Sequence, residues 1–456
     1  MPVIDLRRYH MALQDVPDAR REGRVREAVG IALEAEGLDV SIGELCHIHP
    51  RRRNSGKPAD EIPAEVVGFH GERFVLVPLT DVHGIGPESR VTATGHAFRV
   101  PVGDAMLGRV LDGLGRPIDG HGPLRVEDSY EPSNRPPSPL GRQPISQQIQ
   151  TGVRAIDTAI CCAEGQRMGI FAGSGVGKST LIGMICRNIE ADVRVIALIG
   201  ERGREVRNFI ENDLGPEGLA RSVVIVSTSD QPAMLRLKAA WVATAIAEYF
   251  RDAGLRVALM MDSVTRLAMA QREIGLAAGE PPTSRGYTPS VFSLLPKVLE
   301  RAGMGEVGSI TAFYTVLVDG DDFSEPVTDA VRGILDGHIY LSRDLANENH
   351  FPAIDVLGSV SRVIRDIVDD RHYRLADDLR HVMATYRHAR DMIDIGAYSA
   401  GSNPKIDRAV RLMGQINGFL RQAPDDLTPV SRSLERIEGI LSAPDDAPIT
   451  AIGQIQ

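Results

Sequence analysis

The stretch MGIFAGSGVGKSTL, residues 168–181, decides the fold of this chain. It opens with an apolar, β-prone run, continues as a glycine-rich loop and ends in a helical pattern, which is the order of elements that a phosphate-binding loop requires. The glycines let successive backbone N–H groups turn inward onto phosphate oxygens, and the start of the helix adds its dipole. The stretch therefore predicts an α/β nucleotide-binding domain.

The predicted phosphate-binding residues are consecutive: Ala172, Gly173, Ser174, Gly175, Val176, Gly177, Lys178, Ser179 and Thr180. Lys178 is expected to reach the β- and γ-phosphates and the Ser179 hydroxyl to bind Mg²⁺, so ATP and Mg²⁺ are the expected cofactors. Ala172 stands where the consensus has glycine, and it is small enough to leave the loop intact. A glycine-rich turn with an incidental lysine is the alternative, which the flanking strand and helix patterns disfavour.

Two acidic residues follow other predicted strands. Asp262 ends the apolar run 255–261, the arrangement in which an aspartate holds Mg²⁺ through its water shell. Glu201 follows the predicted strand 193–198, and the carboxyl ends of parallel strands gather on the ligand side of a sheet, so this carboxylate can polarise a water near the γ-phosphate. From spacing alone, a solvated charged turn explains Glu201 equally well.

The pattern of apolar residues divides the chain into regions. Alternating apolar residues from Arg24 to about Gly95 predict a small β-barrel or sandwich. The proline-rich stretch 132–144 predicts an extended connector, and the strands and helices that alternate beyond it predict a mostly parallel sheet. After about Ile367 the apolar residues follow helical spacing, which predicts a helical C-terminal domain.

Composition excludes several classes of protein. The 456 residues contain 51 Lys and Arg against 61 Asp and Glu, a net charge of −10 that argues against a generic nucleic-acid binder. The four cysteines lack the spacing of a zinc site and are too few for a disulfide scaffold, which indicates a reducing cytosol; we assign no role to Cys161–Cys162. No apolar run reaches the roughly 20 residues of a membrane span, and no signal-peptide core opens the chain.

Four further stretches carry a family resemblance: VPVGDAMLGRVLDGLGRPIDG (100–120), TGVRAID (151–157), GERGRE (200–205) and PAIDVLGSVSR (352–362). With the phosphate loop they resemble the F1-type ATPase superfamily, over roughly residues 23–422. The loop FAGSGVGKS, the preceding GQRMGIF and the later RHARDMIDIGAY resemble most closely the flagellum-specific export ATPases of type III secretion. The resemblance implies an N-terminal segment (1–22), a β-barrel (23–95), a RecA-like P-loop domain with a parallel sheet (96–370) and a helical domain (371–456).

The resemblance also implies catalytic roles. Glu201 corresponds to the catalytic glutamate of the GER segment, with Lys178 on the phosphates and Arg202 beside them. Arg362 closes SVSR, which resembles the arginine-finger segment that one subunit offers to its neighbour.

Further site residues come from the same comparison of motifs. Asp262 corresponds to the aspartate that holds the metal through water, with Glu205 as a second contact of that kind, and Arg266 corresponds to an arginine lining the site. Phe351 falls where a tyrosine stacks on adenine in the synthase catalytic subunit.

The implied activity is hydrolysis of ATP coupled to flagellar protein export. Glu201 and Arg362 lie in one chain, so a homohexamer can complete its own sites. The implied partners are export-gate membrane proteins, chaperones and exported subunits, but not nucleic acid, and the implied location is the cytoplasmic side of the inner membrane. At the N-terminus, apolar residues at helical spacing predict a docking segment for a regulatory protein, and a disordered tail is the alternative: Leu6, Tyr9, Leu13 and Val16.

Four other functions compete with this one. An injectisome ATPase and the catalytic subunit of a rotary synthase share the chemistry, although the helical region lacks the strongly acidic segment with which a synthase subunit contacts its stalk. A nucleotide-binding scaffold that does not hydrolyse ATP is disfavoured because Lys178, Glu201 and Asp262 are all present. A RecA-like nucleic-acid translocase is disfavoured by the net charge of −10.

Overall fold

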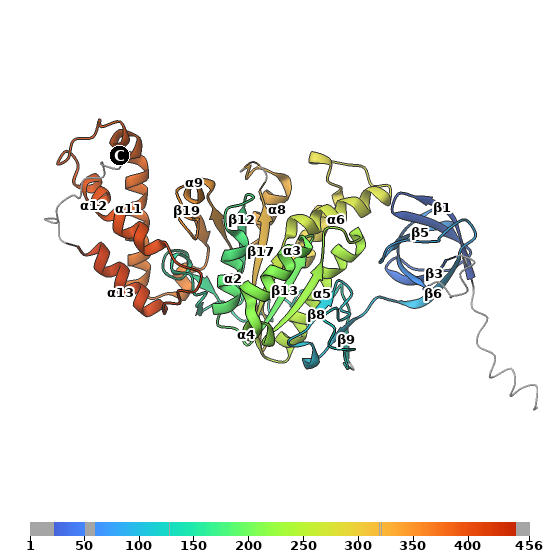
Figure 1. Cartoon of the computed structure of the whole chain (residues 1–456). Helices are drawn as coiled ribbons and strands as arrows, with labels where there is room; N and C mark the ends of the chain where they lie inside the picture. Colours follow the sequence, from blue (N-terminus) through green and yellow to red (C-terminus); the bar gives the residue numbers. More distant parts are fainter. Residues whose placement is uncertain (1–21, 51–59, 127, 319, 321, 444–456) are drawn as a thin grey trace, which may run out of the picture. The chain divides into compact units, whose positions relative to one another are not determined.

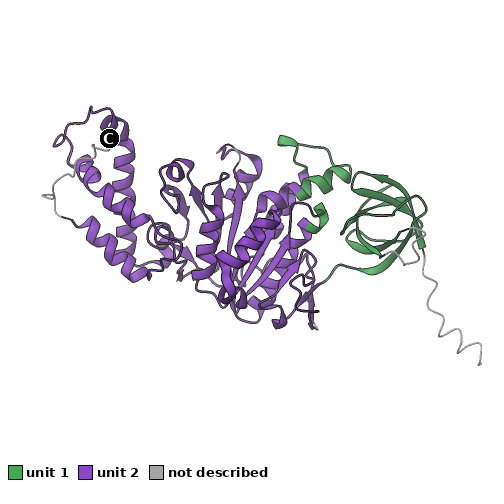
Figure 2. Cartoon of the chain, viewed as in Figure 1, with its two compact units in different colours: residues 1–99, 231–235, 270–288 green, residues 100–230, 236–269, 289–456 purple. Residues whose placement is uncertain are grey.

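The computed structural model describes residues 22–50, 60–126, 128–318, 320 and 322–443. Within these residues there are two compact units (Figure 2): one takes its described residues from 22–99, 231–235 and 270–288, and the other takes them from 100–230, 236–269 and 289–443. The predicted docking segment lies outside the described residues except for Glu22. None of the described helices is long and apolar enough to cross a membrane.

The first strands that the structure describes form a closed six-stranded barrel, hydrogen-bonded in the order β1-β2-β5-β4-β3-β6. Alternate residues of its strands face inward, as Cys46 and Ile48 do in β3, and build an apolar core. The barrel alternative of the sequence prediction is therefore confirmed. Its strands are β1 (Glu22–Val29), β2 (Ala32–Glu36), β3 (Glu44–His49), β4 (Ile62–His70), β5 (Arg73–Pro78) and β6 (Arg90–Ala97).

The second unit contains a nine-stranded sheet in the order β19-β18-β12-β17-β15-β13-β14-β8, with β16 paired to β17 (Figure 1). Its pairings are parallel except those of β16 and β19, which confirms the predicted parallel sheet. The strands are β8 (Val110–Asp112), β12 (Arg167–Ala172), β13 (Val193–Ile199), β14 (Ser222–Ser227), β15 (Arg256–Asp262), β16 (Gly303–Met304), β17 (Ser309–Leu317), β18 (Gly337–Leu341) and β19 (Ile354–Ser361).

Helices lie between most successive strands of the sheet, and one more follows its last strand, β19. They are α2 (Lys178–Asn188), α3 (Gly203–Asn208), α4 (Gly215–Ala220), α5 (Ala233–Asp252), α6 (Val264–Ala277), α7 (Pro289–Leu299), α8 (Pro326–Ile334), α9 (Arg343–Asn347) and α10 (Ile364–Ile367). Two small two-stranded sheets pair β7 (Val100–Val102) with β9 (Asp128–Tyr130) and β10 (Gln148–Ile149) with β11 (Cys162–Ala163).

The proline-rich connector contains no helix or strand between residues 132 and 144. The buried Arg301 and the partly buried Arg142 attach it to the sheet domain. Arg301 donates to the Pro132 carbonyl and pairs at 2.6 Å with Glu248, and both charged groups of that pair are completely buried. Arg142 donates to the carbonyl of Glu300 at 2.6 Å. Arg142 belongs to the connector, so this contact fixes the end of the connector on the sheet domain.

Three helices close the chain: α11 (Asp370–Asp394), α12 (Pro404–Leu420) and α13 (Val430–Leu441). Asp369 caps α11 by accepting a hydrogen bond from the backbone N–H of His372, and Asn403 caps α12 in the same way. The buried Arg154 links these helices to the sheet domain by donating to the Phe419 carbonyl at 2.8 Å and pairing with Asp426 at 2.5 Å. The predicted helical C-terminal domain is confirmed.

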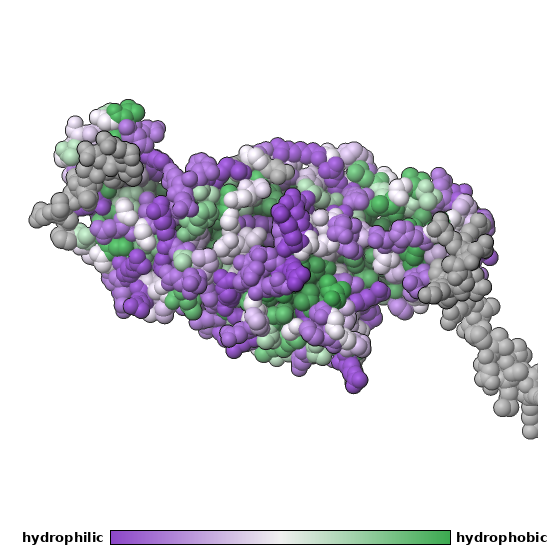
Figure 3. All heavy atoms as spheres, viewed as in Figure 1, coloured by the Kyte–Doolittle hydropathy of each residue, from purple (hydrophilic) through white to green (hydrophobic). Residues whose placement is uncertain are grey.

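Hydrophilic side chains are spread over the face of the molecule drawn in Figure 3, with hydrophobic ones between them in smaller groups. All four cysteines are buried and none is bonded to another.

Candidate active site

The predicted phosphate loop lies between β12 and α2, with β12 inside the sheet and Ala172 buried at its end. Gly175 and Gly177 have φ angles of 81° and 86°, the left-handed region that residues with a Cβ rarely adopt. The Gly177 carbonyl accepts the N–H of Leu181 at 3.0 Å and so starts α2. The sequence pattern therefore produces a loop whose geometry requires its glycines and which ends at the start of a helix.

Lys178, the first residue of α2, brings two predicted carboxylates together. Its Nζ lies 2.5 Å from Oδ1 of Asp262 and 3.4 Å from Oε1 of Glu201. The three side chains are between 8% and 17% exposed. Asp262 ends β15 and Glu201 follows β13, so both carboxylates come from the carboxyl ends of parallel strands, where sequence reasoning placed them.

Thr315 is a site neighbour that sequence reasoning missed. Its hydroxyl donates to Oδ1 of Asp262 at 2.7 Å, from β17, the strand that pairs with β15. Both the hydroxyl and the carboxylate are buried. Its strand, SITAFYTVL, contains a second threonine and a serine, so the local sequence does not single Thr315 out. Only the order of the strands shows that it faces Asp262.

The charges around Lys178 shift its pKa and that of Glu201. Burial, followed by the nearby Asp262 carboxylate, raises the pKa of Glu201 to about 7, although Lys178 acts in the opposite direction. For Lys178, burial acts to lower the pKa, but Asp262 and Glu201 together outweigh it, so the pKa lies above its usual value. Lys178 therefore stays protonated, and Glu201 can gain or lose a proton near neutral pH.

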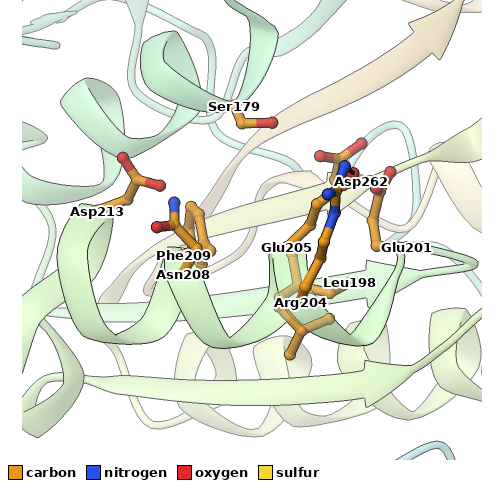
Figure 4. A pocket seen from close by; sticks show the side chains of 10 residues that line it. Ser179, Leu198, Glu201, Arg204, Glu205, Asn208, Phe209, Asp213 and Asp262 are labelled. Atoms are coloured by element: carbon orange, nitrogen blue, oxygen red, sulfur yellow. Dashed lines mark ion pairs between the residues drawn. The ribbon is translucent and has the colours of Figure 1, made fainter.

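A cavity of about 470 Å³ opens beside these groups (Figure 4). Ser179, Glu201, Glu205 and Asp262, four of the predicted residues, line it. The rest of the lining comes from the end of β13, from α3 and from the π-helical segment Phe209–Leu214 that continues it. Sequence reasoning did not find these residues: Leu198, Arg204, Val206, Asn208, Phe209 and Asp213. Apart from Leu198, these residues lie in GERGRE or in the eight residues after it, so the neighbourhood of that motif was the signal that could have found them.

Phe351 lies against the phosphate loop. A Cβ added to Gly177 would lie 3.3 Å from Cδ1 of the Phe351 ring. The ring is 40% exposed, unusual for a large apolar side chain. The Phe351 ring therefore lies close to the start of α2, and part of it is open to solvent.

The two arginines predicted near the phosphates differ in position. Arg202 is 71% exposed, pairs with Glu205 at 3.6 Å and is not part of the cavity lining. Arg266 packs on Gly200, where an added Cβ would come within 2.8 Å of its Cγ. Gly200 has a φ of 70°, so both the backbone and the arginine stem require a glycine there.

Arg362 is at the opposite end of the sheet from its own phosphate loop. The preceding residue, Ser361, pairs with Gly337, which pairs with Met168 near the start of β12, whereas the loop follows the end of β12. The Arg362 side chain is exposed and forms no ion pair or hydrogen bond with the described part of the chain. The strand just before it, β19, is held by Arg380 of α11, which donates to the carbonyl oxygens of Val356 and Ser359.

Comparisons with known proteins agree with this site. Residues 152–361 match the ATP synthase alpha/beta family, nucleotide-binding domain, and residues 368–439 match the T3SS EscN ATPase C-terminal domain. The flagellum-specific ATP synthase of Bacillus subtilis is 53% identical, over 92% of this chain and 95% of its own. The type 3 secretion system ATPase of Xanthomonas euvesicatoria is 52% identical, over 94% and 95%.

Solved structures agree as well. The assembled ATPase EscN from the type III secretion system of enteropathogenic E. coli has a TM-score of 0.88 and 45% identity, covering 92% of this chain and 100% of its own. EscN in complex with its central stalk EscO has a TM-score of 0.84 at 44% identity and the same coverage. Together with the phosphate loop and the carboxylates around Lys178, these similarities show that the chain belongs to the ATP synthase alpha/beta family, in the group of the flagellum-specific ATP synthases and type III secretion ATPases.

Proposed function

We propose that this chain hydrolyses ATP with Mg²⁺ to energise flagellar protein export or to prepare subunits for it. The observation that carries the proposal is the convergence of Lys178, Glu201 and Asp262 at a phosphate loop. Each of the three has a separate task in phosphoryl transfer, so a site that only binds nucleotide would not need them all.

The residues at the cavity fit a magnesium ion. Carboxylate and hydroxyl oxygens are the ligands that Mg²⁺ prefers, and Asp262, Ser179 and Glu205 present them to the same cavity. Two carboxylates lie within 3.4 Å of a single lysine, so their negative charge is not fully balanced and favours binding of a further cation. Ser179 would hold the ion directly, and Asp262 and Glu205 would hold it through water. The ion would neutralise charge on the phosphates.

The protein groups then act in order. Lys178 moves from Asp262 to the phosphate oxygens, which leaves the Asp262 carboxylate for the metal's water shell. Glu201 in its charged form accepts a hydrogen bond from the attacking water and orients it toward the γ-phosphate. Phe351 stacks on the adenine, because its exposed face lies beside the loop that holds the phosphates.

Arg362 supplies the arginine finger to a neighbouring subunit. Its position at the far end of the sheet keeps it away from the phosphates bound by its own chain, and its guanidinium has no acceptor among the residues described. In a homohexameric ring, the Arg362 of each subunit can reach the nucleotide site of the next subunit. Two further arginines keep the roles that the resemblance implies: Arg202, exposed beside Glu205, acts near the phosphates, and Arg266, packed on Gly200, lines the site.

Flagellar export is preferred over the injectisome because of the motif FAGSGVGKS and the flanking segments that resemble the flagellar enzymes, while the two groups of relatives are nearly equally identical to the chain. Under this proposal the N-terminal segment docks a regulatory protein, and the ring works with export-gate membrane proteins, chaperones and exported subunits on the cytoplasmic side of the inner membrane. A synthase catalytic subunit is the second candidate, supported by the nucleotide-binding domain match.

One experiment separates these functions. The gene is deleted in its source organism, and swimming motility and secretion of flagellar subunits are compared after complementation with the intact chain or with Lys178→Ala. We expect motility and secretion to be lost on deletion and restored only by the intact chain. Normal motility in the deletion strain, with loss of secretion through another type III system, would contradict the flagellar assignment.

A further inference from the structure

A second cavity, of about 810 Å³, lies at the other end of the sheet from the phosphate loop. Three arginines at the starts of parallel strands line it: Arg194 in β13, Arg221 just before β14 and Arg256 in β15. The nucleotide cavity is at the carboxyl ends of these strands, so the two cavities are separate. Helix α2 runs between them: Ser179, near its start, lines the first cavity, and Asn188, at its end, lines the second.

The charged side chains that line this second cavity are predominantly positive. Four arginines face two carboxylates, those of Glu190 and Asp192. Asp192 is already engaged, because it accepts the backbone N–H of Arg256 at 2.8 Å and pairs with its guanidinium at 3.4 Å. The fourth arginine, Arg187, donates to two backbone carbonyl groups, those of Asp213 and Pro424. Neither contact neutralises its charge.

Arg194 is the residue whose environment indicates a bound ligand. It is only 6% exposed, yet no carboxylate pairs with it among the described residues. One nitrogen donates to the Ile189 carbonyl at 3.1 Å, while Nε is buried with no acceptor in that part of the chain. Burial lowers the pKa of Arg194, and the charge of Arg221 acts in the same direction. A buried cation without a counter-charge is costly, so an anion that supplies one is bound favourably.

Arg221 adds a second cation beside it. The backbone N–H of Arg194 donates to the Arg221 carbonyl at 3.0 Å, which fixes the two residues as neighbours across β13 and β14. Arg221 is exposed, and its guanidinium has no acceptor within the residues that the structure describes. The two arginines line the same cavity, one buried and one open to solvent. Guanidinium groups suit the oxygens of a phosphate group, which accept their paired N–H donors.

We propose that this cavity binds a small soluble phosphate compound carrying at least two negative charges, held by Arg194 and Arg221 with support from Arg187 and Arg256. The volume lies within the roughly 300–1,000 Å³ typical of small-molecule sites, so it holds more than a single phosphate group. Inorganic pyrophosphate is the simplest probe with this chemistry. Arg256 remains paired with Asp192 at the rim.

The test measures pyrophosphate binding by calorimetry at low salt. The full chain carries Lys178→Ala, which removes the phosphate-loop lysine so that binding at the nucleotide site is weakened. We expect a saturable site in this protein, and an affinity at least about tenfold lower when Arg221→Ala is added, since a charge-assisted hydrogen bond is worth roughly 1.5–3 kcal/mol. Arg194→Gln should have the same effect. The matched control is Arg374→Ala, an exposed arginine on α11 whose Nε donates within its own helix.

Several outcomes would overturn the proposal. One is the absence of saturable pyrophosphate binding in the Lys178→Ala protein, and another is unchanged affinity in Arg221→Ala. Arg221 is exposed, so this variant is expected to fold, and its thermal melting checks that, whatever happens to Arg194→Gln. A parallel arm uses vesicles containing phosphatidic acid: Arg221-dependent binding to these vesicles without binding of pyrophosphate would place the phosphate on a lipid and contradict a soluble ligand.

Discussion

Lys178 Nζ lies 2.5 Å from Asp262 Oδ1, so the lysine of the phosphate loop and the aspartate at the end of β15 form an ion pair across the nucleotide site. The pair is 12% and 8% exposed on its two sides, so solvent screens it little. The same lysine must reach phosphate oxygens during hydrolysis. In our proposal, binding of the nucleotide therefore exchanges one anionic partner of Lys178 for another and releases Asp262 for the metal.

Substituting Lys178 and Glu201 should separate binding from chemistry. Lys178→Ala removes a phosphate contact and should weaken ATP binding as well as turnover. Glu201→Gln keeps the shape but removes the charge that orients water, so ATP binding should persist while hydrolysis falls by about 100-fold or more. Phosphate release and binding of a fluorescent ATP analogue measure the two effects. Glu211→Gln, which changes an exposed glutamate paired with Arg207, is the control. Turnover in Glu201→Gln equal to that of the unmodified protein would exclude Glu201 as the water-orienting group.

The raised pKa of Glu201 predicts how stability depends on pH. The folded chain holds a proton on Glu201 up to about pH 7, whereas the unfolded chain releases it near 4.5, so this contribution to stability is present below pH 4.5 and is lost as the pH rises toward 7. Glutamine resembles the protonated form at every pH. The melting temperature of Glu201→Gln, without nucleotide, should therefore rise relative to that of the unmodified protein between pH 4.5 and 7. A difference in melting temperature that stays constant across this pH range would show that burial does not raise the pKa of Glu201.

Thr315 should act through Asp262. Thr315→Val keeps the shape but removes the hydroxyl that donates to Asp262 at 2.7 Å, so the carboxylate is less firmly held for the metal's water shell. We expect the Mg²⁺ concentration for half-maximal hydrolysis to rise several-fold, with a smaller change in the rate at saturating Mg²⁺. Thr315→Ser should restore the Mg²⁺ dependence. If saturating Mg²⁺ does not restore the rate of Thr315→Val, and Thr315→Ser is equally slow, then Thr315 contributes to packing alone.

Phe351 should affect nucleotide affinity rather than the chemical step. Phe351→Ala removes the ring beside Gly177, and loss of stacking on a base costs roughly 1–3 kcal/mol, which raises KM for ATP by about 5- to 150-fold. Phe351→Tyr should retain the affinity. The KM for ATP and the maximal rate are compared for both variants, and an unchanged KM in Phe351→Ala would remove the ring from the adenine site.

Sequence reasoning found the parts of the site that depend on local pattern. The glycine-rich loop specifies its own backbone, since Gly175 and Gly177 adopt φ angles that favour glycine. The positions of Glu201 and Asp262 follow from one rule, that parallel strands end on the same side of a sheet. These three segments sufficed to predict the nucleotide-binding domain.

The residues it missed depend on contacts between distant segments. Thr315 faces Asp262 only because β17 lies beside β15, an order that no local pattern encodes. Arg194 and Arg221 are neighbours because β13 pairs with β14, although 27 residues of sequence and three helical segments separate them. The location of Arg362 depends on the antiparallel edge strand β19, whose direction the sequence does not reveal.

The central claim is that the site is completed by Arg362 of a neighbouring subunit, and mixing two inactive variants tests it most directly. Arg362→Ala keeps an intact phosphate loop, and Lys178→Ala keeps an intact finger. A finger accelerates hydrolysis by roughly 10³- to 10⁵-fold in GTPases, so each variant alone should be almost inactive. In mixed rings, some interfaces pair an intact loop with an intact finger from the other chain. We expect partial ATP hydrolysis to return in the mixture and to rise with protein concentration. A mixture that stays as inactive as its components, although mixed rings are shown to form by mass spectrometry, would contradict the claim.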